Sequence, residues 1–202
     1  MTGIEMDILI LISRIRCMTE TQVGKVFGTR KRYGRKVLKK TLRKMCNEYT
    51  LKKYPCDINY SGFRENSYVY YLNGSNKYQG EELAKAIIGS ELAIKINLLG
   101  YKLKRFYRNI KIDDGKYDLF IEYINHYGES NQMIVDICLD NNVDISKYEN
   151  IKLKLKKSTI PFYTIPKILL VSSSNIEILF PKKLDVNIEF IDLKLNNLFR
   201  YL

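Results

Sequence analysis

The stretch from Arg30 to Lys44 carries the clearest chemistry in the sequence. Its fifteen residues, RKRYGRKVLKKTLRK, include nine Lys or Arg and no acid. A lysine ammonium neutralises a phosphate as a point charge, whereas the planar guanidinium of arginine forms paired hydrogen bonds with a phosphate or with the edge of guanine. These residue types therefore indicate a surface for a polyanion, and nucleic acid is the polyanion they fit best.

Apolar residues at helical spacing run through the same stretch and just past it. Val37, Leu38, Leu42 and Met45 fall on one side of a helix, so that side can pack while another carries charge. The alternative is an ordinary helix with a solvated cationic face, which is what most charge runs are. The elements around the basic stretch favour a helix that binds DNA.

Two helices are predicted before it. Residues 3–18 place Ile8, Leu11, Ile12 and Ile15 on one face. Thr19 with Gln22 three residues later forms a capping-box pattern, and it opens a short second helix through Val23, Val26 and Phe27 that Gly28 ends.

Two strand-like runs follow, Leu51–Tyr54 and Ser67–Leu72, separated by a polar loop that contains Gly62 and Arg64. Three helices followed by a two-stranded wing predict a winged helix-turn-helix over residues 1–75. The expected core of this domain is Ile8, Leu11, Ile12, Ile15, Val23, Val26, Phe27, Leu38, Leu42, Met45, Val69 and either Tyr70 or Tyr71.

In such a domain the second helix of the helix-turn-helix pair enters the major groove, where base edges are distinguishable. Arg32, Arg35 and Arg43 are the candidates for base readout, the lysines are expected on phosphates, and Arg64 at the wing tip on the backbone or minor groove. The full set of predicted DNA-binding residues is Arg30, Lys31, Arg32, Tyr33, Arg35, Lys36, Lys39, Lys40, Arg43 and Arg64.

The charge of the chain is concentrated in this region. The formal net charge is +12, with a pI near 9.4. Residues 1–72 hold 15 Lys or Arg against 6 Asp or Glu, a net +9, and the rest of the chain holds 19 against 16, a net +3. A membrane surface is a less natural partner for a basic helix inside a folded motif. The many tyrosines leave RNA as an alternative partner, although no RNP-type aromatic motif is apparent.

Neither a metal site nor a disulfide framework is expected. The four cysteines, at positions 17, 46, 56 and 138, form no CxxC pair, and His126 is the only histidine. No cofactor is predicted. The apolar run Ile8–Ile12 is too short to span a membrane and has the wrong charge order for a signal peptide, so a cytoplasmic protein with no membrane partner is expected.

A helical connector is predicted over residues 76–100. The turn-rich segment 73–78 comes before a helix at 81–99, in which Gly89 and Ser90 mark a break or a second start. Leu83, Ala86, Ile87, Ala93 and Ile96 are expected to face inward. This helix connects the domains or pairs with its copy in a homodimer, and one sequence does not separate these alternatives.

An α/β domain is predicted over residues 101–202, which makes the fold class of the whole chain α+β. Strands are expected at 103–112, 117–124, 132–139, 167–172, 176–180 and 188–191, with helices at 146–158 and 193–201. The segments 113–116 and 128–131 are expected as turns.

Asp118 and Asp136 open a second possible chemistry. They occupy successive strands in the layout of the restriction-endonuclease-like fold, in which an acid and then an acid-x-Lys hold Mg²⁺ for phosphodiester hydrolysis. Here Cys138 stands where the lysine belongs, and only Lys152 or Lys154 of the next helix could replace it. The favoured interpretation is that these aspartates are not catalytic, and the alternative is a Mg²⁺-dependent nuclease or nickase.

The whole arrangement resembles the replication-relaxation family of plasmid and phage proteins. The positions that carry the resemblance are Tyr117-Asp118, Asp136 in IVDICL, the helix with Lys152 to Lys157, and the strand from Ile165 to Ser172, within an order of elements that covers roughly residues 5 to 175. The first motif lacks the family's proline. The resemblance implies a winged helix-turn-helix, a helical connector and a degenerate nuclease-like domain. It also implies DNA binding in replication, mobilisation or its control, without established catalysis.

The sequence therefore predicts a sequence-selective binder of double-stranded DNA. Its expected role is in plasmid or phage replication or mobilisation, or in transcriptional control, with replication or mobilisation proteins as further partners.

Overall fold

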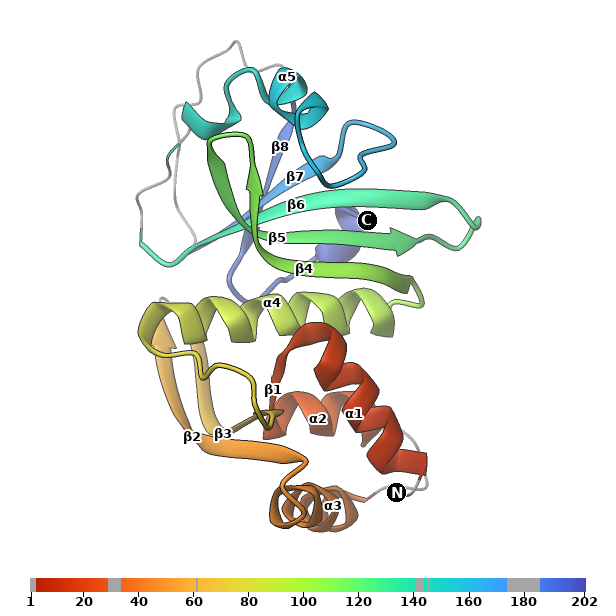
Figure 1. The fold of residues 1–202 in the computed structure, drawn as a ribbon, viewed down its shortest axis with the longest axis vertical. Coiled ribbons are helices and arrows are strands. Elements are labelled where there is room, and N and C mark those ends of the chain that lie inside the picture. Colours follow the sequence, from red (N-terminus) through yellow and green to blue (C-terminus); the bar gives the residue numbers. More distant parts are fainter. Residues whose placement is uncertain (1–2, 29–33, 61, 141–143, 145, 174–185) are drawn as a thin grey trace. The chain divides into compact units, whose positions relative to one another are not determined.

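The structure is a computed structural model that describes residues 3–28, 34–60, 62–140, 144, 146–173 and 186–202. It is a mixed α+β fold with one three-stranded and one five-stranded sheet (Figure 1), which confirms the predicted α+β class. The chain divides into two compact units. Unit 1 comprises Met1–Asn59 and Phe63–Ile94, and unit 2 comprises Tyr60–Gly62 and Lys95–Leu202.

Unit 1 begins with helix α1 (Gly3–Ile15), strand β1 (Cys17–Thr19), helix α2 (Glu20–Phe27) and helix α3 (Arg35–Asn47). Strands β2 (Leu51–Tyr60) and β3 (Phe63–Leu72) follow, and then helix α4 (Gly80–Leu98), most of which belongs to this unit. The sheet order is β1-β3-β2.

Strand β1 corrects the first predicted helix, which was expected to continue to Met18. Helix α1 ends at Ile15 because Arg16 adopts a φ of 75°, in the left-handed region. The next residues then pair antiparallel with β3, Cys17 opposite Tyr71 and Thr19 opposite Val69. The predicted strands 51–54 and 67–72 are present, but both extend much further than the sequence suggested.

The capping box at the start of α2 is confirmed. The Thr19 hydroxyl accepts the Gln22 amide at 3.1 Å, and the Gln22 side-chain oxygen accepts the Thr19 amide at 3.0 Å. The amide nitrogen of the Gln22 side chain then donates to the Ile87 carbonyl (2.9 Å) and to Glu91 (3.2 Å). Lys25 lies 2.6 Å from Glu91 as well. Buried polar contacts therefore tie α2 to α4.

Most of the predicted core of unit 1 is buried. The buried members are Ile8, Ile12, Ile15, Val23, Phe27, Leu38, Leu42, Met45, Val69 and Tyr70. Leu11, Val26 and Tyr71 are only partly buried. Val37, which the helical spacing grouped with Leu38, is 47% exposed because it lies on the flank of α3.

Helix α4 runs without interruption, so the break predicted at Gly89-Ser90 is wrong. Both residues are buried, and the Ser90 hydroxyl donates to the Cys17 carbonyl at 2.6 Å. The small residues therefore mark close packing of the helix rather than its end. Leu83, Ala86, Ile87, Ala93 and Ile96 are buried as expected, and residues 74–79 lie outside regular helix and strand.

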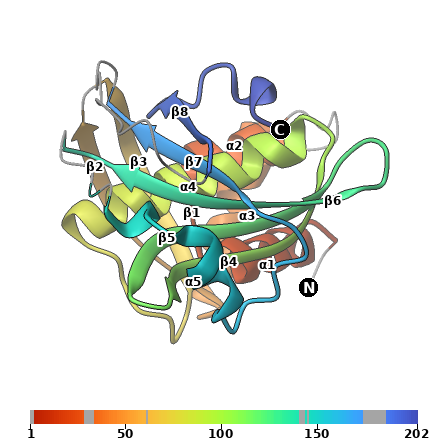
Figure 2. The ribbon, with the colours of Figure 1, turned by 90° about the horizontal axis from the view of Figure 1, so that it is seen from above.

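Unit 2 contains the five-stranded sheet, in the order β4-β5-β6-β7-β8. Strands β4 (Lys102–Ile112), β5 (Gly115–Ile124) and β6 (Ser130–Cys138) are antiparallel, whereas β7 (Lys167–Ser172) and β8 (Ile188–Asp192) run parallel to β6. Figure 2 shows these strands side by side, with the short helix α5 (Ile151–Lys156) over one face. The strand predicted at 176–180 lies outside the described residues.

The two predicted helices of unit 2 are shorter than expected. The segment 146–158 divides into a 3₁₀ turn, Ser146–Tyr148, and α5, because Asn150 adopts a left-handed φ of 55°. Tyr148, Ile151 and Leu155 nevertheless pack together in the core, as the spacing predicted. The helix predicted at 193–201 is wrong, since Leu195 and Asn197 have positive φ and only Leu198–Arg200 forms a 3₁₀ turn.

The orientation of α3 generates a direct test. We expect Leu42→Ala to lower the free energy of unfolding by about 2–5 kcal/mol, because Leu42 is fully buried and its truncation leaves a cavity. Val37→Ala on the same helix is the matched control, with a change within about 0.5 kcal/mol. Urea denaturation of both variants measures the difference. Equal destabilisation by the two substitutions would contradict this orientation.

Candidate nucleic-acid interface

Helix α3 separates its apolar and cationic residues completely. Its thirteen residues, RKVLKKTLRKMCN, include six Lys or Arg and no acid. Leu38, Leu42 and Met45 are buried and form its inner face. At 3.6 residues per turn, the face opposite them carries Lys36, Lys40, Arg43 and Asn47, which we call the outer row. All four residues of the outer row are exposed.

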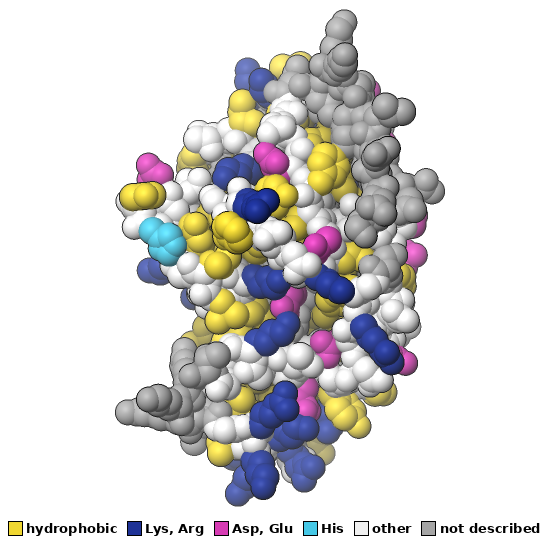
Figure 3. Space-filling model, turned by 180° about the vertical axis from the view of Figure 1, so that it is seen from behind, with side chains coloured by type: hydrophobic (Ala, Val, Ile, Leu, Met, Phe, Trp, Pro, Cys, Tyr) yellow, Lys and Arg dark blue, Asp and Glu magenta, His cyan; other side chains and the backbone are white. Residues whose placement is uncertain are grey.

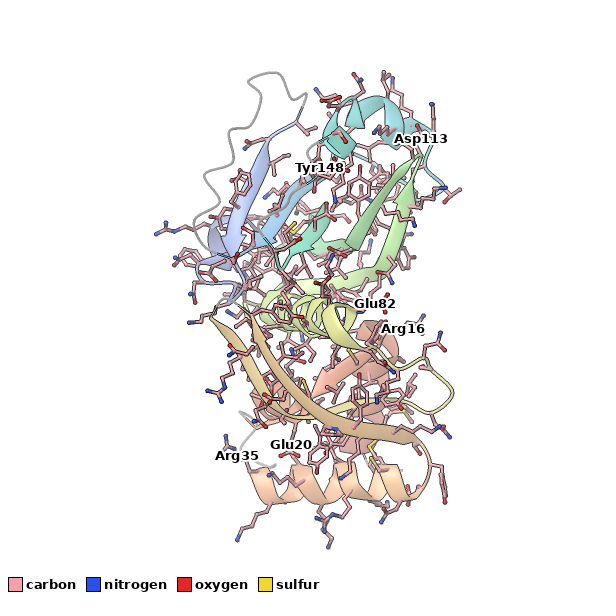
Figure 4. The ribbon with its side chains drawn as sticks, turned by 90° about the vertical axis from the view of Figure 1, so that its left-hand side faces the viewer. Arg16, Glu20, Arg35, Glu82, Asp113 and Tyr148 are labelled. Carbon is pink, nitrogen blue, oxygen red and sulfur yellow. The ribbon has the colours of Figure 1, made fainter. Side chains whose placement is uncertain are left out.

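The figures agree with this division. Figure 4 shows long side chains that project from α3 away from the rest of unit 1. Figure 3 shows Lys and Arg side chains gathered over the end of unit 1 that α3 forms. The cations of α3 therefore gather at one end of unit 1.

The two flanks of α3 are held by acids of neighbouring helices. On one flank the Lys39 ammonium lies 2.8 Å from Glu20 at the start of α2. On the other flank Lys44 lies 2.8 Å from Glu5 of α1, whose side chain is only 4% exposed. The Glu5 carboxylate is the main cause that raises the pKa of Lys44. Two of the six cations are thus already paired within the protein.

The outer row is different. Within the described part of the chain, Lys36, Lys40, Arg43 and the neighbouring Arg35 have no acidic partner. Their charges are fully available to an external anion. A solvated charge that no protein group holds also loses little when a phosphate replaces its water.

Among the residues that the structure describes, none caps the N-terminus of α3 with its side chain. Gly34 occupies the N-cap position without a side-chain hydrogen bond, and the first turn contains Arg35 and Lys36 instead of an acid. Helix α2, in contrast, has a full capping box and Glu20 in its first turn. Uncapped amides at a helix N-terminus attract anions. The N-terminus of α3 therefore favours the binding of an anion, as the cations of the outer row do.

A groove of about 610 Å³ lies beside the N-terminal half of α3. Helix α2, α3 and strand β3 line it, with Arg35 and Lys39 from α3 and Asn66 from β3. Arg64 was expected in a loop but is the second residue of β3, where it is exposed and alternates with Asn66 and Tyr68 on the same face. Arg64 and Asn66 therefore extend the polar surface along β3.

The structure brings together Arg35, Lys36, Lys39, Lys40 and Arg43 on one helix, with Arg64 on β3. The other predicted contacts, Arg30, Lys31, Arg32 and Tyr33, lie outside the described residues. Sequence reasoning did not identify Asn47 as part of the outer row, although its position four residues after Arg43 was a sufficient signal. It also did not foresee the Glu20–Lys39 pair, because residues 19 apart gave no pairing signal.

Asp118 and Asp136 lie on the neighbouring strands β5 and β6, and both bind the backbone. The Ile137 amide donates to Asp118 at 2.7 Å, and the Asp118 amide donates to Asp136 at 3.2 Å. The Tyr148 hydroxyl donates to the second oxygen of Asp136, and Lys147 lies 2.6 Å from that oxygen. Asp136 itself is only 2% exposed. Its carboxylate is therefore occupied by protein groups.

The cation beside Asp136 is Lys147, and sequence reasoning missed it because the family pattern directed attention to later lysines. Lys152 is exposed, whereas Lys154 bonds to Asp114 and to the Lys147 carbonyl. Burial, together with the Asp136 carboxylate, raises the pKa of Tyr148 far above its usual range. Tyr148 therefore remains a hydrogen-bond donor at every physiological pH. These contacts tie the interior strands β5 and β6 to each other and to the segment Ser146–Tyr148.

The described residues contain no group of three or more His, Cys, Asp or Glu side chains placed to hold a metal ion. All four cysteines are free thiols. Within the described ranges, no helix has both the length and the apolar character needed to cross a membrane.

Comparison with known proteins gives no relative for this chain. Neither the family models, nor the curated proteins, nor the solved structures contain a match.

The ion pair of Lys147 generates a stability prediction. We expect Lys147→Ala to lower the free energy of unfolding by about 1–3 kcal/mol, because it leaves the buried Asp136 carboxylate with one partner fewer. Lys152→Ala, which removes an exposed lysine nearby, is the control and should have almost no effect. Chemical denaturation measures both. If Lys147→Ala left the stability unchanged, the ion pair would have no structural role.

Proposed function

We propose that unit 1 is a winged helix-turn-helix and that the protein binds double-stranded DNA through helix α3. The observation that carries this proposal is the outer row of α3. Lys36, Lys40 and Arg43 form a line of cations with no acidic partner among the described residues, on a helix whose opposite face is fixed in the core. The other helices that the structure describes in unit 1, α1, α2 and α4, have no such face.

The topology of unit 1 supports the same proposal. The order α1-β1-α2-α3-β2-β3, with sheet order β1-β3-β2, is the arrangement expected of a winged helix. Helices α2 and α3 are then the helix-turn-helix pair, and β2 with β3 form the wing. The three-residue strand β1, absent from the sequence prediction, completes the sheet of such a domain.

In the proposed complex, α3 enters the major groove and the residues divide by chemistry. Lys36 and Lys40 neutralise phosphates, while Arg35 and Arg43 donate paired hydrogen bonds to guanine. Asn47 can pair with adenine through its amide. Arg64 on β3 contacts the DNA backbone beside the groove.

For the biological role we propose replication or mobilisation of a plasmid or phage, or transcriptional control. This step depends on the resemblance to the replication-relaxation family and on the order of the two units, the first with α3 and the second with Asp118 and Asp136 on adjacent strands. Unit 2 is then a nuclease-like domain without catalysis. A second copy of the chain and replication or mobilisation proteins are the proposed protein partners.

Removing charge from the outer row tests the DNA interface. We expect Lys36→Ala with Lys40→Ala to weaken binding to a labelled duplex by about tenfold or more, or about 1.4 kcal/mol. The matched control is Lys111→Ala with Lys116→Ala, which removes two exposed lysines that pair across β4 and β5 of unit 2. Fluorescence anisotropy measures both double variants. Similar losses in both would show that net charge, and not α3, governs the affinity.

Salt dependence provides an independent measurement. The logarithm of the binding constant should fall linearly with the logarithm of salt concentration, by about 0.9 per neutralised phosphate. The Lys36 and Lys40 double variant should therefore show a slope smaller by about 1.8, since two phosphate contacts are lost. A slope identical to that of the wild type would mean that these lysines do not contact phosphates.

A Mg²⁺-dependent nuclease is the alternative function, and one observation favours it. Lys147 lies 2.6 Å from Asp136, which places a cation beside the acid pair even though Cys138 replaces the expected lysine. Supercoiled plasmid incubated with the protein and Mg²⁺ or Mn²⁺ should stay intact if the protein is not an enzyme. Nicking that both Asp118→Ala and Asp136→Ala abolish would establish the nuclease.

The position of the target DNA distinguishes the two proposed roles. Fragments of the native genome selected for binding and then footprinted should reveal repeated sites near an origin for a replication factor. A repressor should instead protect one palindrome that overlaps a promoter.

A further inference from the structure

Glu20 is an acid placed inside the proposed DNA surface. It is the first residue of α2, and it lines the groove beside α3 together with Arg35 and Lys39. Figure 4 labels Glu20 and Arg35, which lie near the same end of α3. The Glu20 side chain is 25% exposed, so it is accessible from the groove.

Two partners hold the carboxylate of Glu20 in one position. One oxygen lies 2.8 Å from the Lys39 ammonium, and the other accepts a hydrogen bond from the Tyr70 hydroxyl at 3.4 Å. Tyr70 is buried in the core, and after burial the Glu20 carboxylate is the largest cause of its raised pKa. The core therefore anchors Glu20, and Glu20 in turn draws Lys39 toward α2.

The other flank of α3 gives a useful comparison. Lys44 also has an acid within 2.8 Å, but that acid is Glu5, which is almost completely buried. Lys44 compensates part of the cost of burying Glu5. Glu20 is far more exposed, so burial does not oblige it to have a cationic partner.

The physical effect of Glu20 is on the affinity for phosphates. A carboxylate in the groove repels a phosphate that approaches there, and it occupies a lysine that would otherwise bind one. Phosphate contacts supply most of the affinity for non-specific DNA, whereas base contacts distinguish sequences. A fixed repulsive element therefore lowers binding to every sequence and leaves base contacts to decide the preferred one.

We propose that Glu20 is a specificity-determining residue that withholds Lys39 from DNA phosphates and so suppresses non-specific binding. This inference rests on the proposed function of α3. The two sides of α3 then have different roles. The outer row contacts DNA, whereas Lys39 on the flank is held in an ion pair by Glu20.

The test uses the full chain and a labelled duplex of random sequence. Glu20→Gln keeps the size and hydrogen-bonding capacity of the side chain but removes its charge. We expect tighter binding by about fivefold at about 0.15 M salt, which is the worth of one phosphate contact, and a salt slope larger by about 0.9. Addition of Lys39→Ala to this variant should return the salt slope to that of the wild type, since no extra phosphate contact can then form.

The control for charge alone is Glu48→Gln. Glu48 follows the last residue of α3, is exposed, and lies 3.7 Å from Lys44, so its loss changes the net charge of unit 1 equally. It should change the salt slope little. Circular dichroism verifies that each variant is folded, and Glu20→Ala serves as a second variant if Glu20→Gln does not fold.

The outcomes separate the two proposals. Unchanged affinity and slope in Glu20→Gln, an equal gain in Glu48→Gln, or a larger salt slope that persists without Lys39 would each overturn the role of Glu20. A wild-type protein that does not bind duplex DNA at any salt concentration would instead overturn the proposed function, and this inference with it.

Discussion

The burial of Leu38, Leu42 and Met45 is the constraint on which the interpretation of unit 1 depends. These side chains fix the rotation of α3 about its own axis, and the rotation decides which cations point outward. If the apolar pattern were shifted by one position along the sequence, the helix would be turned by about 100°, and Lys36 and Lys40 would lie on a flank. The apolar residues of α3 therefore position its charges as strictly as any direct contact would.

Sequence reasoning predicted this face well because helical periodicity is local information. Three of the four apolar residues singled out in the basic stretch are buried, and the capping box at Thr19 and Gln22 has the expected hydrogen bonds. Local patterns did not reveal strand β1, since its three residues become a strand only through pairing with Val69 to Tyr71. Tertiary contacts also override local signals at Gly89-Ser90, where buried small residues let two segments approach closely.

Unit 2 shows the same difference between local and distant information. The strands were predictable because their apolar runs are long, and β7 matches the predicted bounds 167–172. Both predicted helices were too long, because residues such as Asn150 and Leu195 adopt left-handed conformations that apolar spacing does not reveal. The sequence identified both acids of the pair, Asp118 and Asp136. The ion pair between Lys147 and Asp136 became visible only in three dimensions.

Thr19 has a consequence for the order in which unit 1 can fold. It is the last residue of β1, opposite Val69, and it is also the N-cap of α2. Thr19 therefore takes part both in the start of a helix and in the pairing of a sheet, and its partner Val69 is 50 positions later in the sequence. Contacts this distant in sequence close a large loop and slow folding. The helical pair should therefore gain its final stability only after β3 has been synthesised and has docked, which makes unit 1 cooperative from its first helix to its last strand.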